Sequence, residues 1–280
     1  MAYLRTSRTQ SIATRPPRWP YAVRRDDPLA ADLQLFVTGS YPGIIEHDLH
    51  RPQYSATTGP LTPSVDPMLG EGFSIAGTTT RGLFFSGRST AALTTYTLAA
   101  MMVWVNSGNN FPQLIATSTA NNGVRIGASA AGGGNVQLVK GGIWGSSPVV
   151  ITANVPYFVV ASHDQGSGAY ALMVRRMDSF VLAVGSGTST DVSTAGNGTF
   201  AVGNGRTDFS GSWAGFVSMG MISFKYHKQA ALEDWALQPW RIVEEFNRRT
   251  YFIPAAVGGS FQAAWARGAN TIIQAGPAHA

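Results

Sequence analysis

Short runs of β-forming residues recur along this chain at intervals of about 8–15 residues, and glycine, asparagine and serine separate them. This spacing constrains the fold most, because many short strands joined by turns are typical of a β-sandwich or a β-barrel. The pattern predicts an all-β protein. The predicted strands are Leu33–Val37, Gly82–Ser86, Tyr96–Val105, Gln113–Ala116, Gly123–Gly127, Val136–Val139, Val149–Ile151, Tyr157–Ser162, Tyr170–Arg175, Phe180–Val184, Thr199–Val202 and Phe216–Phe224.

Two segments depart from this pattern. Residues 38–72 contain five prolines and are predicted to be loop-like. Residues 228–246 place leucine and tryptophan at helical spacing, and Pro239 predicts that this helix splits into two short ones. In the strand that begins near Tyr96, alternation of apolar and polar residues predicts a strand with one buried face.

The composition restricts the class of protein. Charged residues make up 12% of the chain, against about 25% in an average soluble domain. The chain has no cysteine, which excludes disulfides and thiolate metal sites. No apolar run approaches the roughly 18 residues of a membrane span, and the N-terminus has arginine and proline where a signal peptide has an apolar segment. We therefore predict that the protein does not associate with a membrane. We also predict that it is released by lysis, as a virus particle is.

The N-terminal segment is basic. The first 25 residues hold six arginines and no acidic residue, and four prolines precede residue 29. Prolines exclude a regular helix, so this segment is predicted to be an extended arm. Aromatic residues are rare in a solvated tail, so the arm is predicted to pack on its own body or on a neighbour. The predicted docking residues are Arg5, Arg8, Arg15, Arg18, Trp19, Tyr21, Arg24 and Arg25.

The arm has three interpretations. Arginine forks bind carboxylates on a neighbouring protein, and they also neutralise the phosphates of nucleic acids. The wide spacing, the prolines and the aromatic residues favour a protein partner over nucleic acid; the third interpretation is a solvated tail. The predicted organisation is an arm over residues 1–28, a sandwich domain over 29–254, and a tail rich in glycine and alanine over 255–280.

The order of several segments resembles the concanavalin A-like, laminin G-like jelly roll, in the version found in bacteriophage structural proteins. The similarity covers about residues 15–254, and the arm segment Arg15–Tyr21 (RPPRWPY) takes part in it. Where the family usually has an acidic residue, this chain has Gly215-Phe216-Val217, which counts against the family's calcium site. The other matching segments are Leu83–Gly87 (LFFSG), Tyr96–Val105 (YTLAAMMVWV), Val155–His163 (VPYFVVASH), Tyr170–Val174, Phe200–Gly203 (FAVG), Phe209–Phe224, Gln238–Trp240 and Arg248–Pro254.

This resemblance implies a fold and a role. The fold is a jelly-roll β-sandwich with an extended N-terminal arm and a short C-terminal helical segment. The role is that of a virion structural protein, either a head decoration protein or a head or tail spike, anchored to capsid or tail proteins through its arm. Virion symmetry favours a homo-oligomer, and a trimer in particular.

Catalysis and metal binding are weighed against simpler interpretations. Glycosidases on this scaffold need two carboxylates about 5–5.5 Å apart, and no such pair stands at alternate positions between Gly82 and Phe224. We therefore predict no enzyme activity, no catalytic residue and no cofactor. His47, Asp48 and His50 have metal-ligand chemistry, but a polar loop is the favoured interpretation. Asp164 is interpreted as a turn residue and not as a calcium ligand, so no metal site is predicted.

A carbohydrate-binding module that recognises a host surface glycan is the rival interpretation. Trp144 and Trp213 are predicted to lie in loops, where their indole rings could stack on sugars. A glycan hydrolase is the third and least favoured interpretation.

Overall fold

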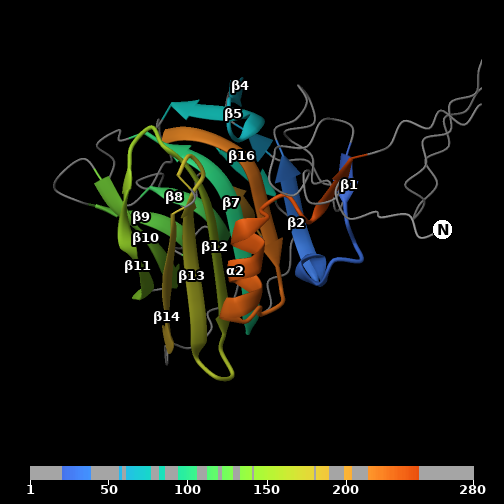
Figure 1. Ribbon diagram of the computed structural model, residues 1–280, viewed down its shortest axis with the longest axis vertical. Helices are drawn as coiled ribbons and strands as arrows, with labels where there is room; N and C mark the ends of the chain where they lie inside the picture. Colours follow the sequence, from blue (N-terminus) through green and yellow to red (C-terminus); the bar gives the residue numbers. More distant parts are fainter. Residues whose placement is uncertain are drawn as a thin grey trace, which may run out of the picture.

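The protein is a sandwich of two antiparallel sheets with a third layer on one side (Figure 1). This confirms the predicted all-β fold class with a short C-terminal helix. The computed structural model describes residues 21–38, 57–58, 61–76, 82–85, 94–105, 112–118, 122–128, 133–140, 142–179, 181–188, 199–203 and 214–245. In this part of the chain no helix is long and apolar enough to cross a membrane.

The larger sheet has eight strands, and its middle is formed by the long strands β12, β7 and β16. β7 pairs with β12 from Thr95↔Asp164 to Val103↔Pro156. On the other edge of β16, β5 and β2 lie end to end, because β5 pairs with the first half of β16 and β2 with the second. In spatial order the strands are β14 (Leu182–Thr188), β13 (Ala169–Arg176), β12 (Pro156–Asp164), β7 (Thr95–Trp104), β16 (Ala214–Ser223), β5 (Gly70–Ala76) and β4 (Thr62–Asp66), with β2 (Leu33–Thr38) beside β16.

The smaller sheet has seven strands. It contains a meander of four consecutive strands from β8 to β11, and β15, β6 and β3 complete it. In spatial order the strands are β11 (Gly142–Thr152), β10 (Gly133–Lys140), β9 (Asn122–Ala128), β8 (Gln113–Ser118), β15 (Phe200–Val202), β6 (Leu83–Phe85) and β3 (Thr57–Thr58).

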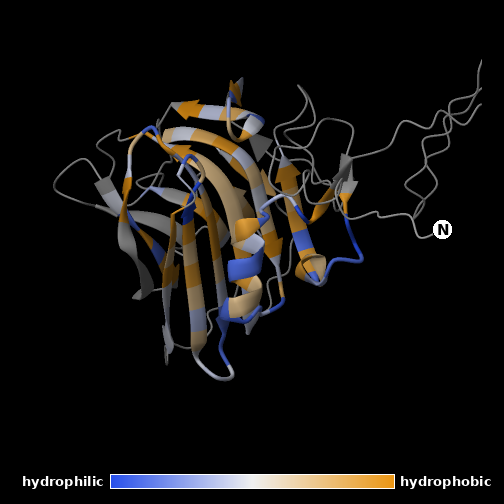
Figure 2. Cartoon of the chain, in the orientation of Figure 1, coloured by the Kyte–Doolittle hydropathy of each residue, from blue (hydrophilic) through white to orange (hydrophobic). Residues whose placement is uncertain are grey.

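The eight-stranded sheet is buried on both faces. Its inner face packs on the seven-stranded sheet, in a core that includes Leu98, Trp104 and Val159. Its outer face is covered by a second core, to which Met101 and Phe158 belong. We call the core between the two sheets the inner core and this second one the outer core. The prediction of a strand with one buried face near Tyr96 was therefore wrong. Figure 2 shows the apolar colouring that this double burial requires along the central strands.

Helix α2 (Gln229–Leu237) lies over this outer face. Leu232, Trp235 and Ala236 are buried on one side of the helix. The indole of Trp235 meets the ring of Phe158 edge-on, with 5.5 Å between the ring centroids. Arg175 of β13 donates a hydrogen bond to the carbonyl oxygen of Ala236 near the helix end, where backbone carbonyls lack helical partners.

The predicted second helix after Pro239 does not form. Residues 239–242 make turns, and β17 (Val243–Glu245) follows as a strand. The physical reason is a partner distant in sequence: β1 (Tyr21–Val23) pairs with β17 and supplies the backbone hydrogen bonds that a helix would otherwise make internally.

The predicted loop over residues 38–72 was also wrong in part, because it contains β3, β4 and the beginning of β5. Pro63 is tolerated in β4, since β4 is an edge strand and needs hydrogen bonds on one side only. The turn that follows is fixed by Asp66, whose Oδ1 accepts the backbone N–H groups of Met68 and Leu69 at 2.8 and 2.9 Å.

Gly215 is required by the close approach of β16 and β7. Its φ angle is 134°, and a Cβ atom at this position would lie 2.0 Å from the carbonyl oxygen of Val103. A side chain would collide with this carbonyl group, so glycine is the residue that fits at position 215.

Candidate functional site

The predicted arm joins the folded body at a two-stranded ribbon. Strand β1 runs antiparallel to β17, with Val23 opposite Val243 and Tyr21 opposite Glu245. Val23 and Val243 are buried in the outer core. Because the strands are antiparallel, the chain enters β1 and leaves β17 at the same end of the ribbon (Figure 1).

An ionic network fixes the residues that follow β1. The carboxylate of Asp27 is 4% exposed; its Oδ2 accepts a hydrogen bond from Nε of Arg241, and the ion pair measures 3.0 Å. Its Oδ1 accepts the backbone N–H of Leu29 at 3.0 Å, which caps the short 3-10 helix η1 (Pro28–Ala30). The same guanidinium donates through Nη1 to Asp234 of α2. We call Asp27, Asp234 and Arg241, together with β1 and β17, the arm-root clamp.

The arm-root clamp was not predicted from the sequence. Asp27 before Pro28 is a recognisable helix N-cap signal, but nothing near Arg241 in the sequence indicates a partner 214 residues away. The clamp ties the start of the described chain to its last helix and strand.

Only three of the predicted docking residues are described. Tyr21 begins β1, and Arg25 is exposed. Arg24 contributes to the clamp: its backbone N–H donates to the carbonyl oxygen of Ile242 at 2.7 Å, and its side chain pairs with Asp26 at 3.8 Å. Arg5, Arg8, Arg15, Arg18 and Trp19 lie outside the described residues, and their docking role stays a prediction.

The predicted sugar-stacking residues are only partly described. Trp144 belongs to β11, an edge strand, and not to a loop as predicted; Trp213 lies outside the described residues. Four polar residues share one register position across β8, β9, β10 and β11. They are Gln113, Arg125, Gln137 and Ser146. Val136 and Leu138, which flank Gln137 in β10, are buried in the inner core, so the side chain of Gln137 lies on the opposite face of its strand.

Asp164 has the geometry of the predicted turn. Its Oδ1 accepts the backbone N–H of Gly166 at 3.0 Å, and its Oδ2 accepts the hydroxyl of Ser167 at 2.7 Å. These bonds, with the Ser167 hydroxyl first, lower the pKa of the carboxyl group. Among the described residues no three His, Cys, Asp or Glu side chains form a metal cluster. His47, Asp48 and His50 lie outside them.

A buried polar network holds the chain where it passes from β16 to α2. The hydroxyl of Thr97 donates to the carbonyl oxygen of Lys225 at 2.6 Å and lies 2.8 Å from the hydroxyl of Ser162. Ser162 in turn accepts the backbone N–H of His227 at 2.9 Å. Burial first, and then the charge of Lys225, lower the pKa of His227 from 6.5 to about 4, against an opposing effect of Asp27.

This shift predicts acid sensitivity. The unfolded chain binds a proton on His227 below pH 6.5 and the folded protein only below about pH 4. Folding is therefore less favourable as the pH falls between these values, by roughly 2 kcal/mol from pH 7 to 4.5. Urea denaturation at the two pH values should show this loss in the wild type and a smaller loss in His227→Gln. An equal loss in both proteins would assign the acid sensitivity to other groups.

Comparison with known proteins supports the fold of this chain and nothing more specific. No protein-family model matches the sequence, and no match was found among curated proteins. Of the solved structures, the binding domain of Paraclostridial Mosquitocidal Protein 1 is similar over 74% of this chain and 52% of that chain, with a TM-score of 0.51 and 8% identity. The enzymatically active domain of tailspike protein 2 from bacteriophage CBA120 is similar over 66% and 30%, with a TM-score of 0.47 and 12% identity.

A sialidase of Trypanosoma rangeli, in complex with 2,3-difluoro-KDN, is similar over 83% of this chain and 38% of that chain, with a TM-score of 0.49 and 13% identity. The chain thus spans about half of these proteins or less. At such low identities the likeness shows a shared β-sandwich, and it confirms that part of the predicted resemblance.

These structures correct the prediction that the protein is not an enzyme. That prediction was inferred from the lack of a carboxylate pair at alternate strand positions. The solved structures similar to part of this chain include a sialidase and a tailspike domain described as enzymatically active, and the prediction is therefore withdrawn. A search for two carboxylates at alternate positions of one strand is insufficient, because side chains from separate strands and loops can converge in a sandwich.

Proposed function

We propose that this protein is a structural component of a bacteriophage particle, attached to another virion protein through its arginine-rich arm. The observation that carries the proposal is the arm-root clamp. An arm that bears load needs a root that does not unravel, and here β1, the buried Asp27 and the ion pair to Arg241 join the arm to the outer core. A solvated tail needs no such root.

The charge distribution indicates the partner. Residues 1–20 hold four arginines and no acidic residue, whereas the remainder of the chain holds 16 Lys and Arg against 15 Asp and Glu. A planar guanidinium binds carboxylates through two parallel hydrogen bonds. The arm therefore fits an acidic surface on a capsid or tail protein. Head decoration and a head or tail spike both meet this description, and a homo-oligomer, with a trimer favoured, would repeat the arm around the attachment axis.

Deletion of residues 1–20 tests attachment. We expect a folded protein, since the deletion ends before β1 and leaves the arm-root clamp intact. Its incorporation into particles, measured by quantitative mass spectrometry of purified virions, is expected to fall at least tenfold. A deletion through residue 25 would also remove β1 and would confuse attachment with stability.

The matched control replaces Arg5, Arg8, Arg15 and Arg18 by glutamine, which removes the charge and keeps the length of the arm. A loss of incorporation in this variant assigns attachment to the arginines. Normal incorporation of the protein that lacks residues 1–20 would refute the proposal. The copy number of the wild-type protein per particle separates head decoration, with hundreds of copies, from a spike, with a few to dozens.

A second candidate function is recognition of a host surface glycan. The register row that joins Gln113, Arg125 and Gln137 favours it, because amide and guanidinium groups suit the hydroxyl groups of sugars. A glycan array with the wild type and with Arg125→Gln tests this candidate. Binding that the substitution leaves unchanged would contradict a site on this row. Analysis of the incubated glycans for shortened chains reports catalysis in the same experiment.

A further inference from the structure

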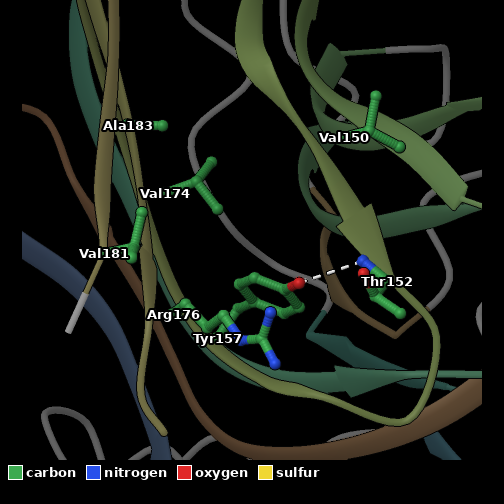
Figure 3. A pocket seen from close by; sticks show the side chains of 7 residues that line it. All are labelled: Val150, Thr152, Tyr157, Val174, Arg176, Val181 and Ala183. Atoms are coloured by element: carbon green, nitrogen blue, oxygen red, sulfur yellow. Dashed lines mark hydrogen bonds between the residues drawn. The ribbon is translucent and has the colours of Figure 1, made fainter. Parts of the chain in front are cut away.

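A pocket opens along the seam where the edge of the eight-stranded sheet meets the edge of the other sheet. Strands β11, β12, β13 and β14 contribute to its walls, and its volume is about 110 Å³. Figure 3 shows the side chains that line it. They are Val150, Thr152, Tyr157, Val174, Arg176, Val181 and Ala183.

The walls of this pocket are aliphatic. Val150 on one side and Val181 on the other are 53% and 55% exposed. Val174 and Ala183 are buried beneath them. The pocket therefore offers apolar contact to a group that enters from solvent.

Two hydrogen-bond donors at the pocket have unused capacity. The hydroxyl of the buried Tyr157 accepts the backbone N–H of Thr152 at 2.9 Å, which leaves its own proton free to donate (Figure 3). Arg176 donates through Nε and Nη2 to the two carboxylate oxygens of Asp178, at 2.6 and 2.9 Å. Its Nη1 makes no bond to any group in the described part of the chain.

We propose that this pocket binds a carboxylate on a compact, branched aliphatic body. The phenol proton of Tyr157 and Nη1 of Arg176 would each donate to a carboxylate oxygen, and the valines would enclose the aliphatic part. A free branched-chain acid has this chemistry, and so does a C-terminal leucine of a peptide. The proposal is independent of attachment to a virion.

The first experiment titrates 4-methylpentanoate into the full-length protein and follows backbone amide shifts by NMR. We expect saturation with a Kd on the order of 1 mM, typical of a small ligand with few contacts, and shifts confined to residues 150–157 and 174–183. The uncharged control of the same shape, 4-methylpentanamide, is expected to bind at least tenfold more weakly. No saturation by the acid, or equal binding of the amide, would overturn the proposal.

Two substitutions at the Arg176–Asp178 ion pair are expected to change the affinity for the carboxylate in opposite directions. Arg176→Gln removes the donor and is expected to weaken binding at least tenfold. Asp178→Asn releases the guanidinium from its carboxylate and is expected to strengthen binding at least threefold. Both side chains are more than a third exposed, so both variants are expected to fold, which the melting temperature checks. Lys228→Gln, which removes an exposed charge on another layer, is the control.

An affinity that neither substitution at the ion pair changes would refute the assignment. A purely structural role of the Arg176–Asp178 pair predicts no gain of affinity in Asp178→Asn. A tetrapeptide that ends in leucine, compared with its C-terminal amide, identifies the source of the ligand. Tighter binding of the peptide acid than of 4-methylpentanoate assigns the site to a protein C-terminus, and weaker binding assigns it to a free acid.

Discussion

Replacing Trp235 by alanine is expected to lower the free energy of unfolding by about 3–5 kcal/mol. The side chain is fully buried between α2 and the eight-stranded sheet. Its indole N–H donates to the carbonyl oxygen of Pro239 at 3.0 Å, so the substitution also removes a bond that holds the turn after the helix. Urea denaturation followed by circular dichroism at pH 7 measures the loss.

Leu237→Ala on the same helix is the matched control. Leu237 is 52% exposed, and its truncation is expected to change the free energy of unfolding by less than about 0.5 kcal/mol. Trp240→Ala is expected to behave like Trp235→Ala, because Trp240 is also buried. If Trp235→Ala were as mild as Leu237→Ala, α2 would not close the outer core.

Replacing Arg241 by methionine is expected to cost about 2–3 kcal/mol. Removal of one partner of a buried ion pair leaves the other charge uncompensated, which costs about 3–5 kcal/mol when both are fully buried. Asp27 is almost inaccessible, but Arg241 is a quarter exposed, so solvent screens part of the loss. The same substitution is expected to accelerate amide hydrogen exchange in β1, since the arm-root clamp is weakened.

A double-mutant cycle tests the clamp directly. Asp27→Asn combined with Arg241→Met should be less destabilised than the sum of the two single variants, by at least about 1 kcal/mol. Lys228→Met, at an exposed position before α2, controls for the loss of a positive charge. A coupling below about 0.3 kcal/mol would show that the ion pair does not hold the arm root.

The local sequence predicted most of the strands because the apolar residues that become buried lie close together within each strand. The segments around β7, β12, β13 and β16 contain enough consecutive apolar residues to be recognised without their partners. Pattern reasoning failed for β4, since a proline in an edge strand looks the same as a proline in a loop. It also failed after Pro239, where a strand forms because β1 lies beside it.

The candidate site was predictable only in its chemistry. The arginines and aromatic residues of the arm are visible in the sequence, and they led to the hypothesis of a docking segment. The clamp beside this segment joins Asp27 to Arg241, and the pocket joins Val150 to Val181. Neither pairing leaves a periodic signal, because the partners belong to different elements.

The sequence by itself determined that this protein is all-β with a basic, proline-rich beginning. Alternation, turn residues and net charge are local properties, and each is complete within a few residues. Only the tertiary structure decided that the large sheet is covered on both faces, that residues 21–27 belong to the folded body, and that two sheet edges form an apolar pocket beside Tyr157 and Arg176. These features depend on contacts between residues far apart in the chain, whose positions are set by the packing of whole sheets and not by any single segment.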